Sequence, residues 1–271
     1  MPLPSPGPDR TCLVTGASSG IGADLARVLA GKGHGVTLVA RREDRLRELA
    51  DELAATGVRA EVVAADLSDL GPREALVREV AERGLTVDVL VNNAGFSTTG
   101  AVHRSDAERE VAMVRTDVEA VVHLCSLLLP GMVERGRGAV LNVASTAAFQ
   151  PLPGQAGYGG SKAFVHSYTR AMAQELSGTG VTATVLCPGP VETEFAAAAG
   201  FDEAEAKASL PQVMWLSSRA VAEAGIAGLE RGRPVVIPGT PNRVMANLSS
   251  FIPRRLLLPV LASRHPALRD R

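Results

Sequence analysis

The chain has few aromatic residues, few cysteines and almost no net charge, and each shortage argues against a class of protein. Aromatic side chains make up 3% of the 271 residues, too few for a surface that stacks nucleic-acid bases. The net charge is −1 and there is no basic cluster of the kind that nucleic-acid binding needs, so we expect no nucleic-acid partner. The three cysteines are scattered without the spacing of a disulfide framework or a zinc site, which predicts reduced thiols, no metal and a cytoplasmic protein.

Targeting and membrane-spanning signals are also missing. The first residues, MPLPSPGPD, are rich in proline and lack the apolar segment of a signal peptide, so we expect residues 1–9 to form a flexible tail. No apolar run reaches the length of a membrane span. Hydrophobic residues make up 46% of the chain and charged residues 21%, which is enough to bury a core.

Short apolar runs alternate with longer amphipathic ones between residues 10 and 239. Seven runs are apolar at nearly every position, as in strands buried on both faces: TCLVTG, GVTLVA, RAEVVAADL, VDVLVNNAG, GAVLNVAS, GVTATVLCPGP and RPVVIPG. Helical patterns occupy residues 21–31, 43–56, 69–83, 106–135, 157–178 and 217–231. This alternation predicts a single α/β domain, a three-layer, doubly wound Rossmann-type fold with a parallel sheet of about seven strands.

Two segments fall outside this alternation. Residues 191–216 interrupt it at the expected carboxyl edge of the sheet, where we predict a substrate lid. Residues 240–271 form an apolar extension that contains arginines and is interrupted by Pro253. We expect this extension to pack on the domain or at a subunit interface. Arginines beside leucines would also suit a membrane surface, which we favour less.

The first strand leads directly into TGASSGIG, residues 15–22, and then into a helix. Gly16 allows a tight turn, Gly20 lets the backbone approach a pyrophosphate, and Gly22 permits close packing of helix and strand. An ordinary glycine turn is the alternative, but the position between strand and helix favours a dinucleotide site. The other residues of this loop expected to contact the cofactor are Ser18, Ser19 and Ile21.

The second strand lacks the carboxylate that would bind the ribose 2′-hydroxyl of NAD. Ala40 fills that position, and Arg41 and Arg42 follow, whose guanidinium groups suit the 2′-phosphate of NADP. A solvated arginine pair is the alternative, yet the missing acid and the added bases agree, so we favour NADP(H) over NAD(H). Further cofactor contacts are expected where the third and fourth strands end, although turn and cap roles are as plausible for each residue alone. These residues are Asp66, Leu67, Asn92, Ala94 and Gly95.

The sequence contains TGASSGIG (15–22), NNAG (92–95), Ser145, YGGSK (158–162) and PGPVETEF (188–195). On these motifs it resembles the short-chain dehydrogenase/reductase family over residues 10–240. It is similar to the classical, NADP-dependent type of that family, in which the serine lies thirteen positions before the tyrosine and the lysine four after. The resemblance implies a carbonyl or secondary alcohol substrate, a homodimer or homotetramer, and nicotinamide contacts from Pro188, Gly189, Val191 and Thr193.

The catalytic chemistry of such a site can be argued from the residues. Reduction of a carbonyl requires a hydride on carbon and a proton on oxygen; a nicotinamide brings the hydride and Tyr158 can supply the proton. Because an unperturbed phenol has a pKa of about 10, a cation one helical turn away, Lys162, would favour the phenolate. Ser145 would hydrogen-bond the substrate oxygen. By resemblance, Lys162 also holds the nicotinamide ribose.

Each of these residues also has an ordinary structural explanation. A serine after a strand is usually a cap, and a tyrosine and lysine four residues apart are usually a surface pair. Phe149, Leu152 and Phe195 are candidates for an apolar substrate pocket or for plain core. The glycine pair that follows Tyr158 costs roughly 1 kcal/mol per residue in a helix, and we expect it to clear space for the cofactor. Close packing against another subunit is the alternative.

One position departs from the family pattern. Asp117 stands where the family usually has an asparagine that holds a water behind the lysine. The aspartate is expected to attract the Lys162 ammonium and to weaken its effect on Tyr158. It is therefore the one sequence feature that supports an alternative function, a cofactor-binding sensor or scaffold with weak or no catalysis.

Overall fold

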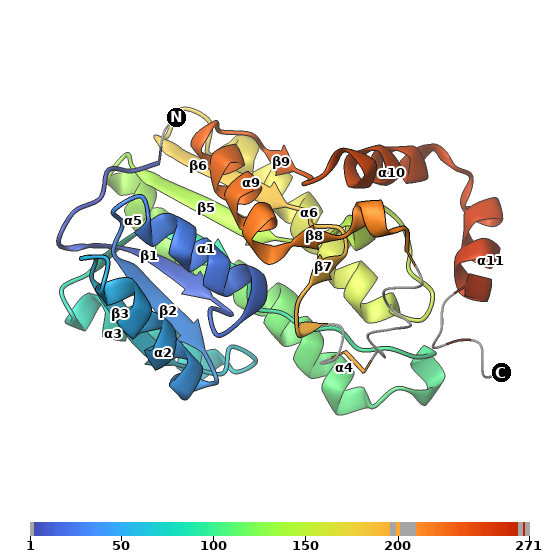
Figure 1. Ribbon diagram of the computed structural model, residues 1–271, viewed down its shortest axis with the longest axis horizontal. Helices are drawn as coiled ribbons and strands as arrows, with labels where there is room; N and C mark the ends of the chain where they lie inside the picture. Colours follow the sequence, from blue (N-terminus) through green and yellow to red (C-terminus); the bar gives the residue numbers. More distant parts are fainter. Residues whose placement is uncertain (1–2, 196–198, 201–209, 265–267, 269–271) are drawn as a thin grey trace.

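Seven parallel strands form the central sheet of the molecule (Figure 1). The computed structural model describes residues 3–195, 199–200, 210–264 and 268. Within that part of the chain the strand order is β3-β2-β1-β4-β5-β6-β9, and every neighbouring pair is parallel. The strands are β1 Arg10–Thr15, β2 Val36–Ala40, β3 Ala60–Ala64, β4 Thr86–Asn92, β5 Gly138–Val143, β6 Val181–Leu186 and β9 Val235–Val236. The predicted doubly wound parallel sheet is confirmed, and its order reverses between β1 and β4, where ligands bind in such folds.

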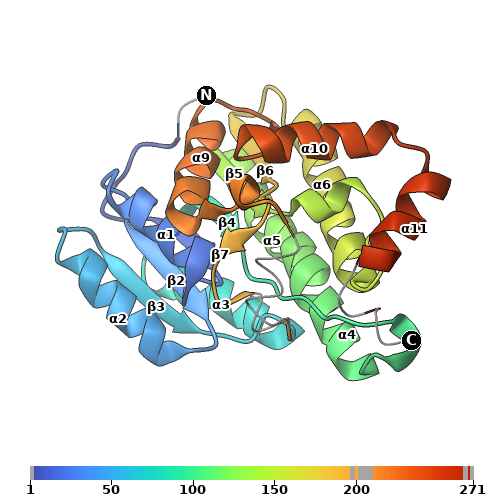
Figure 2. The same ribbon diagram turned by 45° about the vertical axis from the view of Figure 1, so that its right-hand side comes forward.

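Helices cover both faces of this sheet (Figure 2). One face carries α1 Gly20–Ala30, α2 Glu43–Ala54 and α9 Ser218–Glu230, and the other carries α3 Leu70–Glu82, α5 Ala120–Glu134 and α6 Ala156–Glu175. Short 3-10 turns lie at η1 Val102–Arg104, η3 Thr146–Phe149 and η4 Gln212–Met214. The observed helices agree with the predicted ranges to within a few residues.

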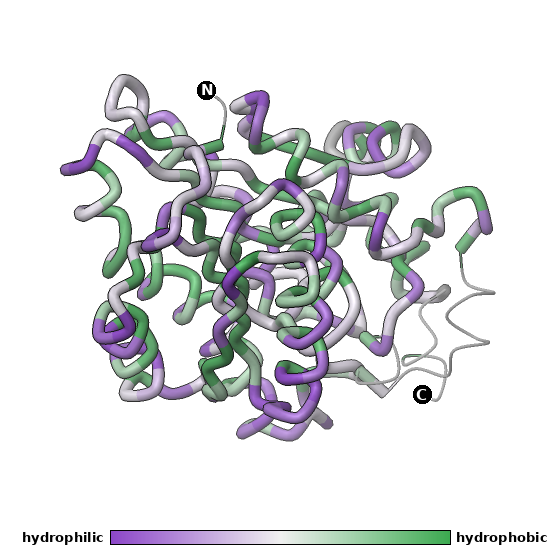
Figure 3. Tube along the Cα trace, turned by 60° about the vertical axis from the view of Figure 1, so that its left-hand side comes forward, coloured by the Kyte–Doolittle hydropathy of each residue, from purple (hydrophilic) through white to green (hydrophobic). Residues whose placement is uncertain are grey.

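Each face of the sheet has its own apolar core. Successive residues of a strand point to opposite faces, so Cys12 and Val14 lie in one core and Leu13 in the other. This is why the strand sequences are apolar at nearly every position. Leu3, from the N-terminal segment, packs against the first core. Many of the hydrophilic stretches lie at the outer turns of the molecule (Figure 3).

A long helical segment, 107–134, lies across the second face. It consists of α4 Ala107–Val114, a π-helical turn η2 Arg115–Glu119, and α5. By length and composition alone this segment passes the test for a membrane span. Leu124 and Cys125 are nevertheless fully buried in the second core, so the segment packs here as a core helix of the domain.

The two ends of the predicted lid are joined in a small parallel ladder that the sequence did not reveal. β7 Val191–Glu192 pairs with β8 Leu216–Ser217. Much of the lid between them, residues 196–198 and 201–209, lies outside the described residues. After β9 the chain forms α10 Thr240–Phe251 and α11 Arg254–Arg264, which lie at one outer edge of the molecule in both views (Figures 1 and 2).

Candidate active site

The glycine-rich loop after β1 leaves the start of α1 open. Ser19 occupies the N-cap position with extended backbone but makes no side-chain cap, so the first N–H groups of α1 are available to an anion. Gly16 has a φ of +65°, and a Cβ there would lie 2.8 Å from Ala94 Cα. A Cβ on Gly22 would collide with the Gly16 carbonyl. The loop therefore requires glycine at these two positions, and its shape fits a pyrophosphate.

Arg42 lies against this loop. Its guanidinium donates to the hydroxyls of Ser18 (3.2 Å) and Ser19 (2.9 Å) and forms an ion pair with Glu194 at 3.0 Å. The neighbouring Arg41 side chain is 72% exposed and lies only 3.9 Å from a carboxylate oxygen of Asp66. Two cationic groups thus stand at the end of β2, and Arg41 is loosely held enough to turn to an anionic ligand.

Asp66 is ionised at neutral pH. Burial raises the pKa of this carboxyl, but hydrogen bonds from Ser68 and the charge of Arg41 outweigh burial and hold the pKa below its ordinary value. The Ser68 amide donates to Asp66 Oδ1 at 2.9 Å. Leu67, in contrast, is buried in the second core, so its side chain does not face the loop.

Tyr158 and Lys162 lie one turn apart on α6, and both are buried, with 8% and 5% of their surface exposed. The Lys162 ammonium is 5.6 Å from the centre of the Tyr158 ring. Ser145 follows β5 and hydrogen-bonds the Tyr158 phenol. The Ser145 hydroxyl also accepts the amide of Ala147 at 3.1 Å, so this serine is both a cap and a neighbour of the phenol.

Burial dominates the ionisation of Tyr158. It raises the pKa of the phenol; the Lys162 ammonium lowers it, the Asp117 carboxylate raises it again, and the Ser145 hydrogen bond lowers it. The net effect raises the pKa above its ordinary value. Tyr158 is therefore a neutral phenol at physiological pH and holds a proton that it can donate.

Asp117 is the direct partner of Lys162. Its Oδ2 lies 2.9 Å from the Lys162 Nζ, and its Oδ1 accepts the amide of Phe96 at 3.0 Å. Burial lowers the pKa of Lys162, but the charges of Asp117 and Tyr158 and the hydrogen bond to Asp117 outweigh it, so the pKa is raised and the ammonium persists. Burial also raises the pKa of Asp117, against the effect of Lys162. The ammonium completes its contacts by donating to the Val143 carbonyl at 3.2 Å.

A family model described as short chain dehydrogenase matches residues 10–204. The chain belongs to this family. It is 42% identical over 187 residues to a putative ketoacyl reductase of Streptomyces coelicolor, covering 68% of this chain and 72% of the relative. It is 38% identical over 190 residues to a short chain dehydrogenase of Pseudocercospora fijiensis, covering 69% of this chain and 62% of that relative.

A solved short-chain dehydrogenase from Sphingobium yanoikuyae, in complex with NADPH, has the same fold. It superimposes with a TM-score of 0.78 at 32% identity and covers 90% of this chain and 97% of that one. Other matching structures hold NADP⁺ or NADH. The relatives are reductases and dehydrogenases, so this member of the family is an oxidoreductase.

In the NNAG segment, the asparagine that contacts the glycine-rich loop is not the one that we predicted. The Asn92 amide donates to Asn142 at 2.8 Å, inside the sheet. It is the neighbouring Asn93, not singled out in the sequence, whose amide reaches the carbonyls of Thr15 (3.0 Å) and Gly16 (3.2 Å). Two adjacent asparagines gave no sign of which would point to the loop. The Gly95 backbone passes so close to the catalytic cluster that a Cβ there would lie 2.9 Å from an oxygen of Asp117.

The segment after β6 borders the glycine-rich loop. A Cβ on Gly20 would lie 3.0 Å from the Thr193 methyl, so Thr193 borders the loop. The Pro188 carbonyl accepts the amide of Thr146 at 2.8 Å, which ties this segment to the turn after Ser145. Gly189 packs on the side chain of Asn242, and Val191 packs against the first core.

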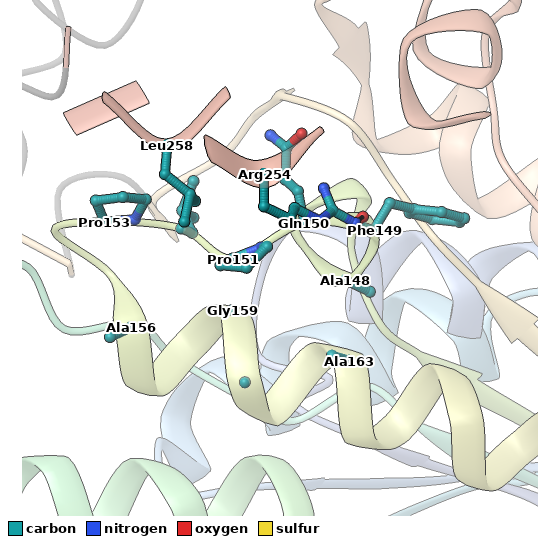
Figure 4. A pocket seen from close by; sticks show the side chains of 12 residues that line it. Ala148, Phe149, Gln150, Pro151, Pro153, Ala156, Gly159, Ala163, Arg254 and Leu258 are labelled. Carbon is teal, nitrogen blue, oxygen red and sulfur yellow. Dashed lines mark hydrogen bonds between the residues drawn. The ribbon is translucent and has the colours of Figure 1, made fainter. Parts of the chain in front are cut away.

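The glycine pair on α6 faces away from the catalytic cluster. Gly159 packs on Leu152, where a Cβ would lie 3.1 Å from the Leu152 Cβ, and a Cβ on Gly160 would meet nothing within 4 Å. Both line a cavity of about 510 Å³ between α6, the segment 148–153 and α11 (Figure 4). The expectation that the glycines clear space for the cofactor is therefore wrong: Gly159 leaves room for segment 148–153, and Gly160 borders the open cavity.

Two of the three residues proposed for an apolar substrate pocket line this same cavity. Phe149 and Leu152 line it, on the far side of α6 from the phenol. Phe195 is different: its ring centre lies 5.6 Å from that of Tyr158. Of the three apolar candidates, Phe195 is the one that the structure places against Tyr158.

Proposed function

We propose that this protein catalyses NADP(H)-dependent reduction of a carbonyl, or oxidation of a secondary alcohol, with Tyr158 as the acid/base. The observation that carries the proposal is the cluster of buried Tyr158 and Lys162 with half-buried Ser145, together with the open N-terminus of α1. A phenol, an ammonium and a hydroxyl are the groups that proton transfer to a carbonyl oxygen requires.

The cofactor site fits a dinucleotide phosphate. The open N-terminus of α1 and the glycines of the loop suit the pyrophosphate, and exposed Arg41 suits the 2′-phosphate by charge and geometry. Bound there, the dinucleotide supplies or accepts the hydride. The NADPH complex of a family member at 32% identity supports this preference.

Side chains of the protein donate the proton and stabilise the charges that its transfer creates. In the direction of reduction, Tyr158 gives its phenolic proton to the substrate oxygen while carbon receives the hydride, so a carbonyl becomes an alcohol. Ser145 donates a hydrogen bond to the same oxygen and stabilises its developing charge. The Lys162 ammonium stabilises the phenolate that remains until a proton from solvent restores it. Oxidation of an alcohol reverses these steps and starts from the phenolate.

Replacing Tyr158 by Phe tests the assignment. The variant keeps the ring but has no proton to give, so we expect kcat to fall about 10²- to 10⁴-fold. The dissociation constant for NADPH, measured by calorimetry, should stay within about twofold. A panel of ketones assayed with NADPH provides the turnover. If the variant reduced them at the wild-type rate, another group would be the proton donor.

A cofactor-binding sensor or scaffold without turnover is the second candidate, and the ion pair of Lys162 with Asp117 is the observation that favours it. A carboxylate on the ammonium reduces its help to the phenol. Tight NADPH binding with no turnover on any ketone or alcohol would support this candidate. A homodimer or homotetramer, implied by the family resemblance, and a cytoplasmic location, inferred from the scattered cysteines, accompany either function as predictions.

A further inference from the structure

The helix α10 is amphipathic with its apolar side outward. The residues that face the domain are Asn242, Ala246 and Ser249, which are 1%, 4% and 7% exposed. Those that face outward are Val244, Met245 and Leu248, which are 55%, 51% and 51% exposed. A surface helix of a globular protein normally has the opposite arrangement.

Hydrogen bonds fix α10 in this orientation. The buried Asn242 amide donates to the carbonyls of Met214 (3.0 Å) and Pro238 (3.2 Å), and the Ser249 hydroxyl donates to the Ala246 carbonyl. The bond to Met214 joins α10 to a distant segment of the domain, so rotating the helix to bury its aliphatic side would break it and leave the buried Asn242 amide without this partner. The outward apolar side is therefore a stable feature of the fold.

The next helix extends the same kind of surface. On α11, Leu256 is 61% exposed and Val260, one turn later, is 48% exposed. The two helices follow each other along one outer edge of the molecule (Figures 1 and 2). We call the five residues Val244, Met245, Leu248, Leu256 and Val260 the C-terminal apolar surface.

Positive charge accompanies this surface. Between residues 231 and 269 the sequence has no aspartate or glutamate and seven arginines: Arg231, Arg233, Arg243, Arg254, Arg255, Arg264 and Arg269. Since the whole chain has a net charge of −1 and residues 270–271 cancel, the preceding 230 residues carry −8. Such asymmetry within one chain indicates an anionic partner for the basic part.

The arginines of α10 and α11 differ in their roles. Arg254 is used internally, because it donates to the carbonyls of Ser249 and Phe149, both at 3.1 Å. Arg243 and Arg255 are exposed next to the apolar residues. A two-fold contact between two copies through this surface would bring arginines against arginines, with no acid in the segment to offset them. This argues against a second copy as the occupant.

We propose that the C-terminal apolar surface docks on an anionic lipid bilayer. Its aliphatic side chains enter the boundary between headgroups and acyl chains, while Arg243 and Arg255 bind lipid phosphates. Negatively charged lipids meet both requirements, whereas a neutral bilayer meets only the first. The proposal does not depend on the catalytic assignment, because none of these residues belongs to the active site.

Flotation of the full-length protein with vesicles tests the proposal. Vesicles of phosphatidylcholine with 30% phosphatidylglycerol should bind at least tenfold more protein than phosphatidylcholine alone, and 0.5 M NaCl should remove most of the difference. The double variant Arg243→Gln with Arg255→Gln should bind about 30-fold more weakly. The double variant Met245→Gln with Leu256→Gln should lose at least tenfold.

A matched control removes two exposed arginines elsewhere. Arg47→Gln with Arg78→Gln, on α2 and α3, has the same change of charge and should bind like the wild type. All variants change exposed side chains, and unchanged thermal unfolding verifies that each is folded. Equal binding to neutral and anionic vesicles, or undiminished binding by the first variant, would overturn the proposal. So would a Met245/Leu256 variant that dissociates an oligomer, by light scattering, yet still binds vesicles fully.

Discussion

At the scale of single residues, the position of Asp117 changes the electrostatics of the site. Its carboxylate lies 2.9 Å from the Lys162 ammonium and is fully buried, so the attraction is not screened by water. A neutral asparagine would leave the ammonium to act on Tyr158 alone. The carboxylate instead raises the pKa of Tyr158, in addition to burial. The residue therefore favours the proton-bearing phenol that reduction needs.

Replacing Asp117 by Asn tests this effect through the pH dependence. Reduction requires the phenol and is lost as pH rises through the pKa of Tyr158, whereas oxidation requires the phenolate and is gained over the same range. Removing the carboxylate lowers that pKa, so both transitions should move to lower pH. Initial rates in both directions across pH 6 to 11 provide the measurement.

Glu119 offers a matched control in the same helical turn. It pairs with Arg73 and its side chain is 52% exposed, so Glu119→Gln removes a charge without touching Lys162. This variant should keep the wild-type pH profile. A shift of the Asp117→Asn profile to higher pH would show that the carboxylate acts mainly by keeping Lys162 charged, contrary to the prediction.

Arg41→Ala tests cofactor choice. A guanidinium–phosphate hydrogen bond contributes about 1.5–3 kcal/mol, so NADPH should bind about 10- to 100-fold more weakly to the variant, while NADH changes less than twofold. Calorimetric titration with each cofactor measures this. Arg47→Ala, an exposed arginine on α2 paired with Glu43, should leave both affinities unchanged. Equal losses for NADPH and NADH would mean that another group binds the 2′-phosphate.

The part of the site that could be predicted from the sequence consists of residue types that recur at fixed spacing. The loop, Ser145 and Lys162 follow from such spacing, because strand ends and helical turns position them. The roles of Asn92 and Asn93 do not follow, since the two are adjacent where β4 ends and only the packed sheet decides which amide points inward. The Asp117–Lys162 ion pair joins two helices and depends on tertiary packing in the same way.

At the scale of elements, the strands and helices were predictable because each is long enough to show its period. The exceptions are local. The π-helical turn 115–119 inside the predicted helix 106–135 leaves no sequence signal, yet it carries Asp117, and such turns are frequent at functional sites. The two-residue strands β7 and β8 are too short for a pattern, and their pairing joins residues 25 positions apart.

The glycine pair of α6 provides a test of helix energetics. A Cβ on Gly160 would meet nothing within 4 Å, so Gly160→Ala should gain up to about 1 kcal/mol of helix propensity. That corresponds to a rise in Tm of about 2–4 °C for a domain of this size. Gly159→Ala should gain nothing or lose stability, because its Cβ would press on Leu152. Thermal unfolding followed by circular dichroism measures both, and equal gains would refute the packing argument.

At the scale of the whole molecule, three features show how far burial could be predicted from the sequence. The buried thiols of Cys12, Cys125 and Cys187 are unpaired, as the scattered cysteines predicted. The helical segment 107–134, although apolar enough for a membrane span, contributes Asp117, the ion-pair partner of Lys162. The orientation of the C-terminal helices could not be predicted from the sequence. The usual rule that apolar residues face the core would turn these helices the wrong way, because several of their apolar residues face outward.

Linkage between cofactor binding and folding gives a final test that needs no substrate. A ligand that binds only the folded state at 100 times its Kd stabilises that state by about 2.7 kcal/mol. For a domain of this size the Tm should rise by about 5–10 °C with NADPH, and by less with the same concentration of NADH. In the Arg41→Ala variant the two shifts should become similar, because the group that distinguishes the 2′-phosphate is gone. A wild-type shift that is as large with NADH would show that the protein does not discriminate between the cofactors, whatever the charge at the end of β2.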